Sequence, residues 1–365
     1  MKYLLIVIAV VVLAFGVLLL MTGNTGELKV EGEVDMKSPE VVPQTPESSL
    51  KTIYLAGGCF WGVEEYMDRV YGVVDSESGY ANGKWENPSY EDLIYKNSGH
   101  AETVKITYDA AIVDLEVLLA HYFKIIDPTT LNRQGNDIGV QYRTGVYYES
   151  EADREIIEDF IRLEEAAYED PILVEVVPLD GYYPAEDYHQ DYLKKNPGGY
   201  CHIDLSKSVE VVIPMSKYPR PQDEVIKEKL SELSYNVTQL DATERAFTSG
   251  LYTNEARGIY VDIVTGEPLF TSFDKFESGS GWPSFVKPIA PEVLVEKSDT
   301  KLGYLRVEVR SRSGDSHLGH VFEDGPKDRG GLRYCINGAA LEFVPLEEMV
   351  SRGYGYLMAL FNEAE

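Results

Sequence analysis

The sequence predicts an α+β domain followed by a β-rich domain, both placed after an apolar N-terminal segment. Its length of 365 residues suits two domains of about 150 residues each, and a hydrophobic content of 44% is sufficient for two packed cores. Between the two halves, Pro214, Pro219 and Pro221 interrupt the helical and strand patterns. We therefore assign residues 51–205 to the first domain, 206–222 to a linker, 223–350 to the second domain and 351–365 to a C-terminal tail.

The apolar segment, residues 1–21, is predicted to be a transmembrane anchor or an uncleaved signal. Residues 4–21 carry no charge and would extend about 27 Å as a helix, close to the roughly 30 Å hydrocarbon core of a bilayer. No small-residue cleavage site follows, which favours an anchor over secretion after cleavage. Lys2 before the run and acidic residues after it predict domains on the periplasmic or extracellular side. Residues 22–50 are acidic and rich in proline, as a spacer would be.

The first domain mixes strand and helix signals. One apolar strand ends at Gly57-Gly58, a turn that leads directly into a helix. Another strand alternates in polarity, and two later segments have the spacing of amphipathic helices. The predicted strands are residues 53–56, 100–108 and 173–178, and the predicted helices are residues 60–70, 113–126 and 151–167. A sheet packed against helices would bury these apolar faces.

The second domain opens with a predicted amphipathic helix over residues 222–233 and then turns to strands. Residues 258–271 have the pattern of a hairpin around Thr265-Gly266-Glu267. Residues 304–310 alternate as a strand, and glycine-rich turns recur as far as Phe343. These signals favour a β-rich sandwich or an open barrel.

The charge and the cysteine count narrow the possible functions. A formal net charge of −28 excludes a sequence-independent grip on nucleic acid, which requires lysine and arginine. The same charge is typical of a soluble, self-repelling surface. Three cysteines are too few for a disulfide scaffold, and an odd number leaves at least one thiol unpaired. An unpaired thiol outside the cytoplasm favours redox chemistry.

The first cysteine of interest lies in Gly58-Cys59-Phe60-Trp61-Gly62. Its place at the start of a predicted helix favours the thiolate, because free N–H groups and positive potential lower the thiol pKa there. Taken alone, the motif is equally compatible with a cysteine buried in an aromatic core. A carboxylate at Glu102, phenols at Tyr80 and Tyr142, and a second thiol at Cys201 on a glycine-rich segment favour chemistry. That second thiol could exchange with Cys59.

With these motifs in this order, residues 51–205 resemble methionine sulfoxide reductase A. The resemblance implies a ferredoxin-like α+β fold in which Cys59 attacks the sulfoxide sulfur and becomes a sulfenic acid. It implies that Glu102 protonates the departing oxygen, helped by burial that raises its pKa. Cys201 would then form a disulfide that a thioredoxin-like protein reduces. The implied substrate contacts are Phe60 and Trp61 at the methyl group, Tyr80 and Tyr142 at the oxygen, and Asp137 in support.

The second cysteine of interest is Cys335, in Arg333-Tyr334-Cys335-Ile336-Asn337. Upstream, His317 and His320 stand three residues apart, which is a spacing seen in metal sites. A zinc site needs about four ligands, and no cysteine pair or nearby carboxylate completes one in the sequence. Acid–base or oxyanion roles are therefore favoured, with a structural hydrogen-bonding pair as the alternative. Arg333 would hold Cys335 as a thiolate, unless it forms only a surface ion pair.

Residues 216–345 resemble methionine sulfoxide reductase B, which implies an all-β fold of two antiparallel sheets. The resemblance makes Cys335 the nucleophile, Arg333 its activator and Trp282 the contact for the substrate methyl group. The implied polar site consists of His317, His320 and Asn337.

Two departures from the family pattern affect the second domain. The positions that hold two zinc-binding C-x-x-C pairs in many members are Asp262, Thr265, Ser311 and Gly314 here, so we expect no zinc. A resolving cysteine often occupies the position of Ser280, and a serine cannot form that disulfide. We therefore expect an external thiol to reduce the oxidised Cys335 directly; delivery from Cys201 is the alternative.

Together the two resemblances imply a fusion that reduces methionine sulfoxide, free or in proteins, and so repairs oxidised proteins. The first domain would act on the S epimer and the second on the R epimer, with no bound cofactor or metal and with electrons from the external thiol. One competing hypothesis is a catalytically silent acidic binding protein, which would not need intact Cys59, Glu102, Cys201 and Cys335. Another is general thiol–disulfide exchange, for which the chain lacks a C-x-x-C pair.

Overall fold

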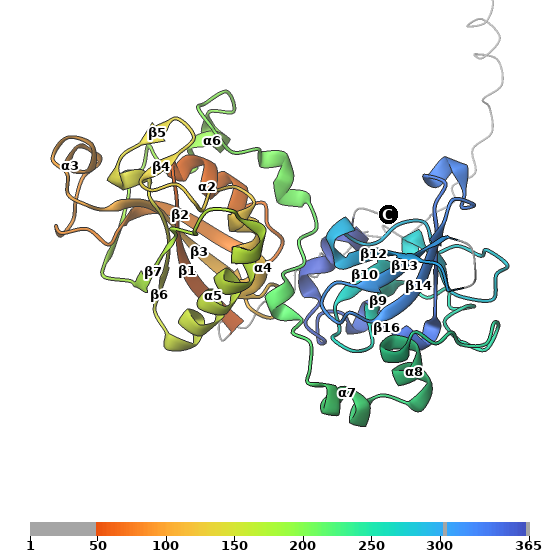
Figure 1. The fold of residues 1–365 in the computed structure, drawn as a ribbon. Helices are drawn as coiled ribbons and strands as arrows, with labels where there is room; N and C mark the ends of the chain where they lie inside the picture. The colour runs from red at the N-terminus through yellow and green to blue at the C-terminus, as the bar shows by residue number, and fades with distance from the viewer. Residues whose placement is uncertain (1–48, 302–304, 363–365) are drawn as a thin grey trace, which may run out of the picture. The chain divides into compact units, whose positions relative to one another are not determined.

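The computed structural model describes residues 49–301 and 305–362 (Figure 1). The predicted anchor, residues 1–21, and nearly all of the predicted spacer lie outside these residues. Within the described part of the chain, no helix is both long and apolar enough to cross a membrane. We describe the two domains separately.

The first domain is built on a six-stranded sheet with the order β7-β6-β1-β3-β2-β8. Neighbouring strands are antiparallel except for β6 and β7, which run parallel. The strands are β1 (Leu50–Gly57), β2 (Val73–Ala81), β3 (Ala101–Asp109), β6 (Thr144–Tyr148), β7 (Glu175–Pro178) and β8 (Tyr182–Pro184). A separate two-stranded ribbon consists of β4 (Arg133–Gln134) and β5 (Asp137–Ile138).

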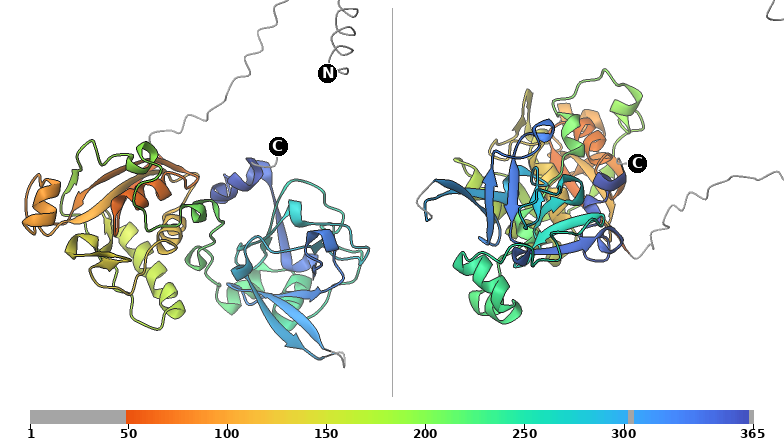
Figure 2. Two further views of the ribbon diagram at one scale, coloured as in Figure 1. Left: turned by 90° about the horizontal axis from the view of Figure 1, so that it is seen from above. Right: turned by 90° about the vertical axis from the view of Figure 1, so that its right-hand side faces the viewer.

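Helices cover one face of this sheet. In Figures 1 and 2, α2, α4 and α5 lie against this face. Their apolar side chains join those of the central strands in one buried cluster. Tyr54, Ala56 and Tyr147 point to the opposite face and form a smaller cluster of their own, as the alternation of side chains along a strand requires. The helices are α2 (Phe60–Met67), α3 (Tyr90–Tyr95), α4 (Leu115–Phe123), α5 (Glu151–Glu164) and α6 (Tyr192–Lys195).

The register of the central strands brings the predicted site residues of the first domain to one end of the sheet. β1 ends at Gly57, and the chain turns through Gly58 into α2. β3 begins at Ala101, and the next residue, Glu102, lies opposite Tyr80 of β2. Cys59, Glu102 and Tyr80 therefore come together although they are distant in the sequence.

The second domain contains two antiparallel sheets, which confirms the β-rich prediction. Their strand orders are β10-β9-β16 and β11-β15-β14-β13-β12. The rings of Phe270 and Phe285 stack at 4.2 Å between centroids, and Tyr260 packs edge-on against Phe285. The strands are β9 (Gly258–Asp262), β10 (Pro268–Thr271), β11 (Ser284–Phe285), β12 (Leu294–Asp299), β13 (Arg306–Ser311), β14 (His317–Phe322), β15 (Arg333–Ile336) and β16 (Leu341–Pro345).

Two expectations about the second domain need correction. The predicted helix over residues 222–233 is two helices, α7 (Asp223–Lys229) and α8 (Glu232–Leu240), because Leu230 is extended and the Ser231 hydroxyl caps the second helix through the Ser234 N–H. The predicted C-terminal tail folds back as α9 (Ala359–Asn362), where the buried ring of Phe361 packs on Phe273.

Candidate active sites

The first thiol occupies a tight turn. Gly58 has a φ of +84°, and a side chain there would collide with Gln134, so only glycine suits the position. Cys59 is the N-cap residue of α2 and is only 7% exposed. The N–H groups of Trp61 and Gly62 lower its pKa, but burial and the charge of Glu102 raise it more. The expectation of a low pKa at Cys59 is therefore wrong, because burial alone is the largest cause of the raised pKa.

Glu102 is the buried carboxyl group beside this thiol. It is 2% exposed, and its Oε2 accepts a hydrogen bond of 3.0 Å from the Phe60 N–H. Burial is the largest cause of a pKa raised to about 8, with the nearby Asp137 charge adding to it. The raised pKa expected from the sequence is confirmed. Near neutral pH Glu102 is mainly protonated, which removes its charge from Cys59 and makes it a proton donor.

The aromatic wall next to the thiol is held by residues from a distant part of the chain. Phe60 is buried, and the Trp61 Nε1–H donates to His189 Nδ1 at 3.1 Å. The Trp61 ring also stacks on Tyr192, with centroids 3.7 Å apart and planes within 14°. His189 and Tyr192 were not predicted from the sequence, because nothing local links them to Trp61.

The phenols differ from the prediction. The hydroxyl of Tyr80 donates to Glu186 Oε2 at 2.7 Å, so it is already engaged away from the thiol. Tyr90 instead faces Tyr142, Glu102 and Cys59. Burial, and after it the charges of Glu102 and Cys59, raise the Tyr90 pKa to about 12, while the hydrogen bond with Tyr142 lowers it. Tyr142 faces the same groups, as predicted, and its pKa is raised by the same causes. Tyr80 is therefore replaced by Tyr90 among the phenols that face the site.

Local structure fixes the position of Tyr90. Ser89 caps α3 in a capping box with Asp92, and Tyr90 is the first residue of that helix. The Tyr90 N–H donates to Glu186 Oε1 at 3.0 Å, so one carboxylate holds both Tyr90 and Tyr80. The capping box was visible in the sequence and could have drawn attention to Tyr90.

Cys201 lies over the first turn of α2. A side chain added at Gly62 would meet its Sγ at 3.2 Å. The Cys201 Sγ–H donates to the carbonyl of Ile203 at 3.4 Å, and all three cysteines are free thiols. Asp137, in β5, accepts a hydrogen bond of 3.1 Å from the Tyr200 hydroxyl. The structure thus brings together the predicted nucleophile, acid and second thiol of the first domain.

The second thiol site lies where β11, β14 and β15 meet. Cys335 pairs across the strands with His320 on one side and Ser284 on the other. The Trp282 Nε1–H donates to the Glu244 carbonyl at 3.2 Å, which fixes the indole ring at the rim. The cavity at this thiol is lined by Thr243, Trp282, Arg306, Gly319, His320, Phe322, Cys335 and Asn337.

Arg333 is held in place beside Cys335. Its guanidinium donates two hydrogen bonds of 2.8 Å to Asp324 and lies 4.5 Å from the ring centre of Phe322. Burial is the largest effect on the Cys335 pKa and raises it, whereas Arg333 and Ser280 lower it. The predicted activation by Arg333 is thus present but smaller than the effect of burial. Asp324, which orients the guanidinium, was not predicted.

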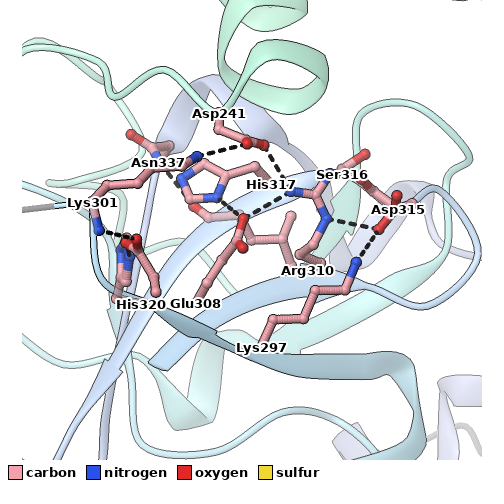
Figure 3. A network of polar contacts seen from close by, with 12 residues as sticks. Asp241, Lys297, Lys301, Glu308, Arg310, Asp315, Ser316, His317, His320 and Asn337 are labelled. Atoms are coloured by element: carbon pink, nitrogen blue, oxygen red, sulfur yellow. Dashed lines mark hydrogen bonds and ion pairs between the residues drawn. The ribbon is translucent and has the colours of Figure 1, made fainter. Parts of the chain in front are cut away.

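The two histidines belong to a network of charged side chains on β12, β13 and β14 (Figure 3). His320 Nε2 lies 2.8 Å from Asp299 Oδ2, and His317 Nδ1 lies 2.6 Å from Glu308 Oε1. His320 lines the cavity at the thiol, but His317 does not and instead packs edge-on against His320. The predicted polar site therefore contains His320 and Asn337 directly and His317 only through its neighbour.

Carboxylates do lie near the histidines, contrary to the expectation from the sequence. Ligand atoms of Asp241, Glu308 and His317 lie within 4.8 Å of one another, a spacing that a metal ion could use. The positive charge of Arg310 takes the place that a metal ion would have, because its Nη1 lies 2.8 Å from the carboxylates of both Asp241 and Glu308. The cluster is an ion-pair network centred on arginine.

The four positions named for zinc also lie together. Asp262 is fully buried and accepts hydrogen bonds from the hydroxyls of Ser311 at 2.7 Å and Thr265 at 3.3 Å. Ser316 donates to the same carboxylate at 3.0 Å, and Gly314 leaves it room. A carboxylate surrounded by hydroxyl donors takes the place of four thiolates, and this donor set does not suit structural zinc.

Ser280 lies beside the second thiol. Its Oγ is 3.8 Å from Cys335 Sγ and 2.8 Å from the Ser278 hydroxyl. Ser278 in turn contacts Ser284 at 2.7 Å. A chain of three hydroxyl groups thus leads to Cys335 from the position where a resolving cysteine was considered.

Comparison with known proteins identifies both halves. Residues 51–218 match the family model described as peptide methionine sulfoxide reductase, and residues 230–345 match the SelR domain. The chain belongs to the methionine sulfoxide reductases. It is a fusion of the A and B types, as predicted, and it reduces methionine sulfoxide with one stereospecific domain for each epimer.

Solved structures of A-type methionine sulfoxide reductases are similar to the first domain. Mxr1 from Saccharomyces cerevisiae in its reduced form is 37% identical over 43% of this chain and 92% of that chain, with a TM-score of 0.41. Methionine sulfoxide reductase A of Corynebacterium diphtheriae is also 37% identical, over 42% of this chain and 78% of that chain, with a TM-score of 0.39.

Proposed function

We propose that Cys59 is the nucleophile and Glu102 the acid of the A-type reaction. The observation that carries this assignment is a carboxyl group with a pKa of about 8 in contact with the turn that bears a buried thiol. The sulfur of Cys59 attacks the sulfoxide sulfur, and the proton of Glu102 moves to the sulfoxide oxygen. The S–O bond of the substrate and the transient bond between the two sulfurs then break as the hydroxyl group passes to Cys59. Cys59 becomes a sulfenic acid, methionine leaves with one fewer oxygen atom, and the proton lost by the Cys59 thiol restores the acid form of Glu102.

Tyr90 and Tyr142 are suited to bind the sulfoxide oxygen before it is protonated. Both phenols have raised pKa values, so they stay protonated and can donate hydrogen bonds at neutral pH. Phe60 and Trp61 would contact the substrate methyl group, since both rings flank the thiol. Tyr80 would act indirectly, through the Glu186 carboxylate that it shares with Tyr90.

Cys201 is proposed to resolve the sulfenic acid at Cys59. Its thiol attacks the Cys59 sulfur, the S–O bond breaks, and hydroxide leaves with the thiol proton as water. The resulting disulfide then needs two electrons from outside the chain. A related structure is described as Mxr1 from Saccharomyces cerevisiae in complex with Trx2, with 28% identity over 91% of that chain. We propose a thioredoxin-like donor for this protein too.

Cys335 is proposed as the nucleophile of the B-type reaction. Arg333, held in place by Asp324, would favour its thiolate, although the Asp324 charge itself raises the thiol pKa. His320 and Asn337 would bind or protonate the sulfoxide oxygen, and Trp282 would contact the methyl group. The sulfenic acid at Cys335 would be reduced directly by an external thiol. Ser280 supports this route, because the side chain beside the thiol is a hydroxyl.

The test is to supply purified S and R epimers of a blocked methionine sulfoxide with dithiothreitol. Glu102→Gln should abolish most reduction of the S epimer and leave the R epimer unaffected. Arg333→Met should slow reduction of the R epimer, by a smaller factor, and leave reduction of the S epimer unaffected. If Glu102→Gln reduces the S epimer as fast as the unaltered protein, Glu102 is not the acid.

We further propose that residues 1–21 anchor the enzyme with both domains outside the cytoplasm. The uncharged run over residues 4–21 supports this placement. Extraction of membranes with alkaline carbonate tests it: an anchored protein stays in the pellet, and a protein found in the soluble fraction contradicts the proposal. Protease treatment of sealed cells would report the side on which the domains lie.

A further inference from the structure

The segment that carries Cys201 is held on two sides. Along residues 200–203, successive side chains point in opposite directions, as in an extended strand. Cys201 and Ile203 point to α2, where a side chain added at Gly62 would meet Cys201 Sγ at 3.2 Å and Ile203 Cδ1 at 2.9 Å. Gly62 therefore provides the space in which the second thiol lies.

The other two side chains of the segment point to the loop that carries Asp137. The Tyr200 hydroxyl donates to Asp137 Oδ2 at 3.1 Å, and His202 Nδ1 lies 3.8 Å from the same oxygen. The imidazole also lies against Gly58, the residue before Cys59, since a side chain added there would meet His202 Cε1 at 3.2 Å. Asp137 thus ties the second thiol's segment to the turn that holds the first thiol.

His202 has an unusual environment for a buried imidazole. Among the described residues, neither of its ring nitrogens finds a hydrogen-bond partner, although both are buried. A buried polar group without a partner costs about 1–3 kcal/mol, so a purely structural role does not account for histidine here. The carboxylate of Asp137 is the charged group that faces it, and burial lowers the His202 pKa while Asp137 raises it.

We propose that Asp137, Tyr200 and His202 form a latch that holds the Cys201 segment against α2 and thereby sets the rate of disulfide formation. This inference rests on the proposed role of Cys201 in resolving the sulfenic acid. Tyr200 and His202 are positioning residues, because they act on Cys201 by placing it one helical turn from Cys59. Asp137 also acts on Glu102, so the test substitutes only Tyr200 and His202, to which the proposed reduction of the sulfoxide assigns no role.

The two steps separate in a single-turnover experiment with the full-length protein, the S epimer and no reductant. Methionine release measures the first step, and intact mass distinguishes the sulfenic acid, which adds an oxygen, from the disulfide, which loses two hydrogens. We expect His202→Phe to slow disulfide formation about tenfold or more, because it removes the imidazole that faces the Asp137 carboxylate. Methionine release should keep its rate, and the sulfenic acid should accumulate and react with dimedone.

Matched variants keep the test decisive. Tyr200→Phe retains the ring and loses only the hydroxyl contact with Asp137, so it should slow the same step. His202→Gln retains a donor for Asp137 and should restore part of the rate. Asn196→Ala is the control, because Asn196 lies four residues before Tyr200, at the end of α6, and its side-chain amide donates to the Tyr192 carbonyl. The melting temperature of each variant is measured, and rates are compared only among variants whose melting temperature equals that of the unaltered protein.

Three results would overturn the latch or its premise. Equal slowing of methionine release and disulfide formation would show that His202 serves the fold or the first step. Unchanged disulfide formation in both His202→Phe and Tyr200→Phe would show that the segment needs no latch. An unaltered protein that releases methionine without forming the disulfide would remove the role of Cys201, and one that releases no methionine would contradict the proposed function itself.

Discussion

Cys59 lies beside a buried carboxyl group, whereas Cys335 lies across the strands from a histidine and next to an arginine. The charges of Glu102 and Asp137 both raise the pKa of the Cys59 thiol. Burial raises the pKa of the Cys335 thiol, but the neighbouring charge of Arg333 lowers it. We therefore propose that the same net reaction on the two epimers uses a different proton source in each domain.

The two thiols also differ in what lies next to them. Cys201 lies over the helix turn that follows Cys59, and Ser280 lies 3.8 Å from Cys335. One site therefore has a second thiol within the same domain and the other has a hydroxyl group. We therefore propose that the electron route, as well as the acid, differs between the two domains.

The largest expected effect comes from removing the buried acid. Glu102→Gln keeps the size of the side chain and loses the proton, so reduction of the S epimer should fall about 10²- to 10⁴-fold, the usual contribution of general acid catalysis. Reduction of the R epimer serves as the control within the same molecule. An equal loss for both epimers would show that the substitution disturbs more than the first site.

The pH dependence should separate the two sites next. Glu102 donates a proton only in its acid form, and its pKa is raised to about 8, so reduction of the S epimer should decline as the pH rises through about 8. The R epimer should lack this decline. Steady-state rates of reduction of each epimer between pH 6 and pH 10 measure this decline. A rate for the S epimer that rises across this range would show that thiolate formation limits the first site.

A smaller effect is expected from Arg333→Met, which removes the positive charge beside Cys335 and the partner of Asp324. The thiol pKa should rise, and reduction of the R epimer should fall about tenfold. The rate of Cys335 alkylation as a function of pH reports the pKa directly. A Cys335 that alkylates with an unchanged pH profile would exclude Arg333 as its activator.

The mildest change is Ser280→Cys, which should give the second domain a resolving thiol. Because the serine oxygen is already 3.8 Å from Cys335, a disulfide should form in the first turnover with the R epimer. The number of free thiols that remain after that turnover measures how much of the disulfide has formed. Ser278→Cys is the matched control, and a disulfide that forms equally well there would show that mobility, not position, decides the pairing.

Much of this organisation was predictable from the sequence. Cys59 at a helix start, Glu102 in a strand and Cys335 beside Arg333 follow from local patterns, and the structure places each of them as expected. The raised pKa of Glu102 also follows from burial. The exchange of Tyr80 for Tyr90 was harder to predict. Tyr80 lies near the end of β2 and Tyr90 at the start of α3, and their three-dimensional partners decide which phenol faces the thiol.

Other misses have a common physical origin. Asp324, Asp299 and Glu308 hold Arg333, His320 and His317 across strands or turns, and such pairs leave no periodic signal. The break between α7 and α8 depends on one capping serine, Ser231, within a continuous helical pattern. Long-range contacts decide these features, and sequence periodicity reports only local ones.

The central claim is that the two sites act independently on opposite epimers. It is tested most directly by measuring reduction of the separate S and R epimers by Cys59→Ser and Cys335→Ser in the full-length protein with dithiothreitol. We predict that Cys59→Ser loses only the S epimer and Cys335→Ser only the R epimer. Loss of both epimers in either variant would contradict independent sites.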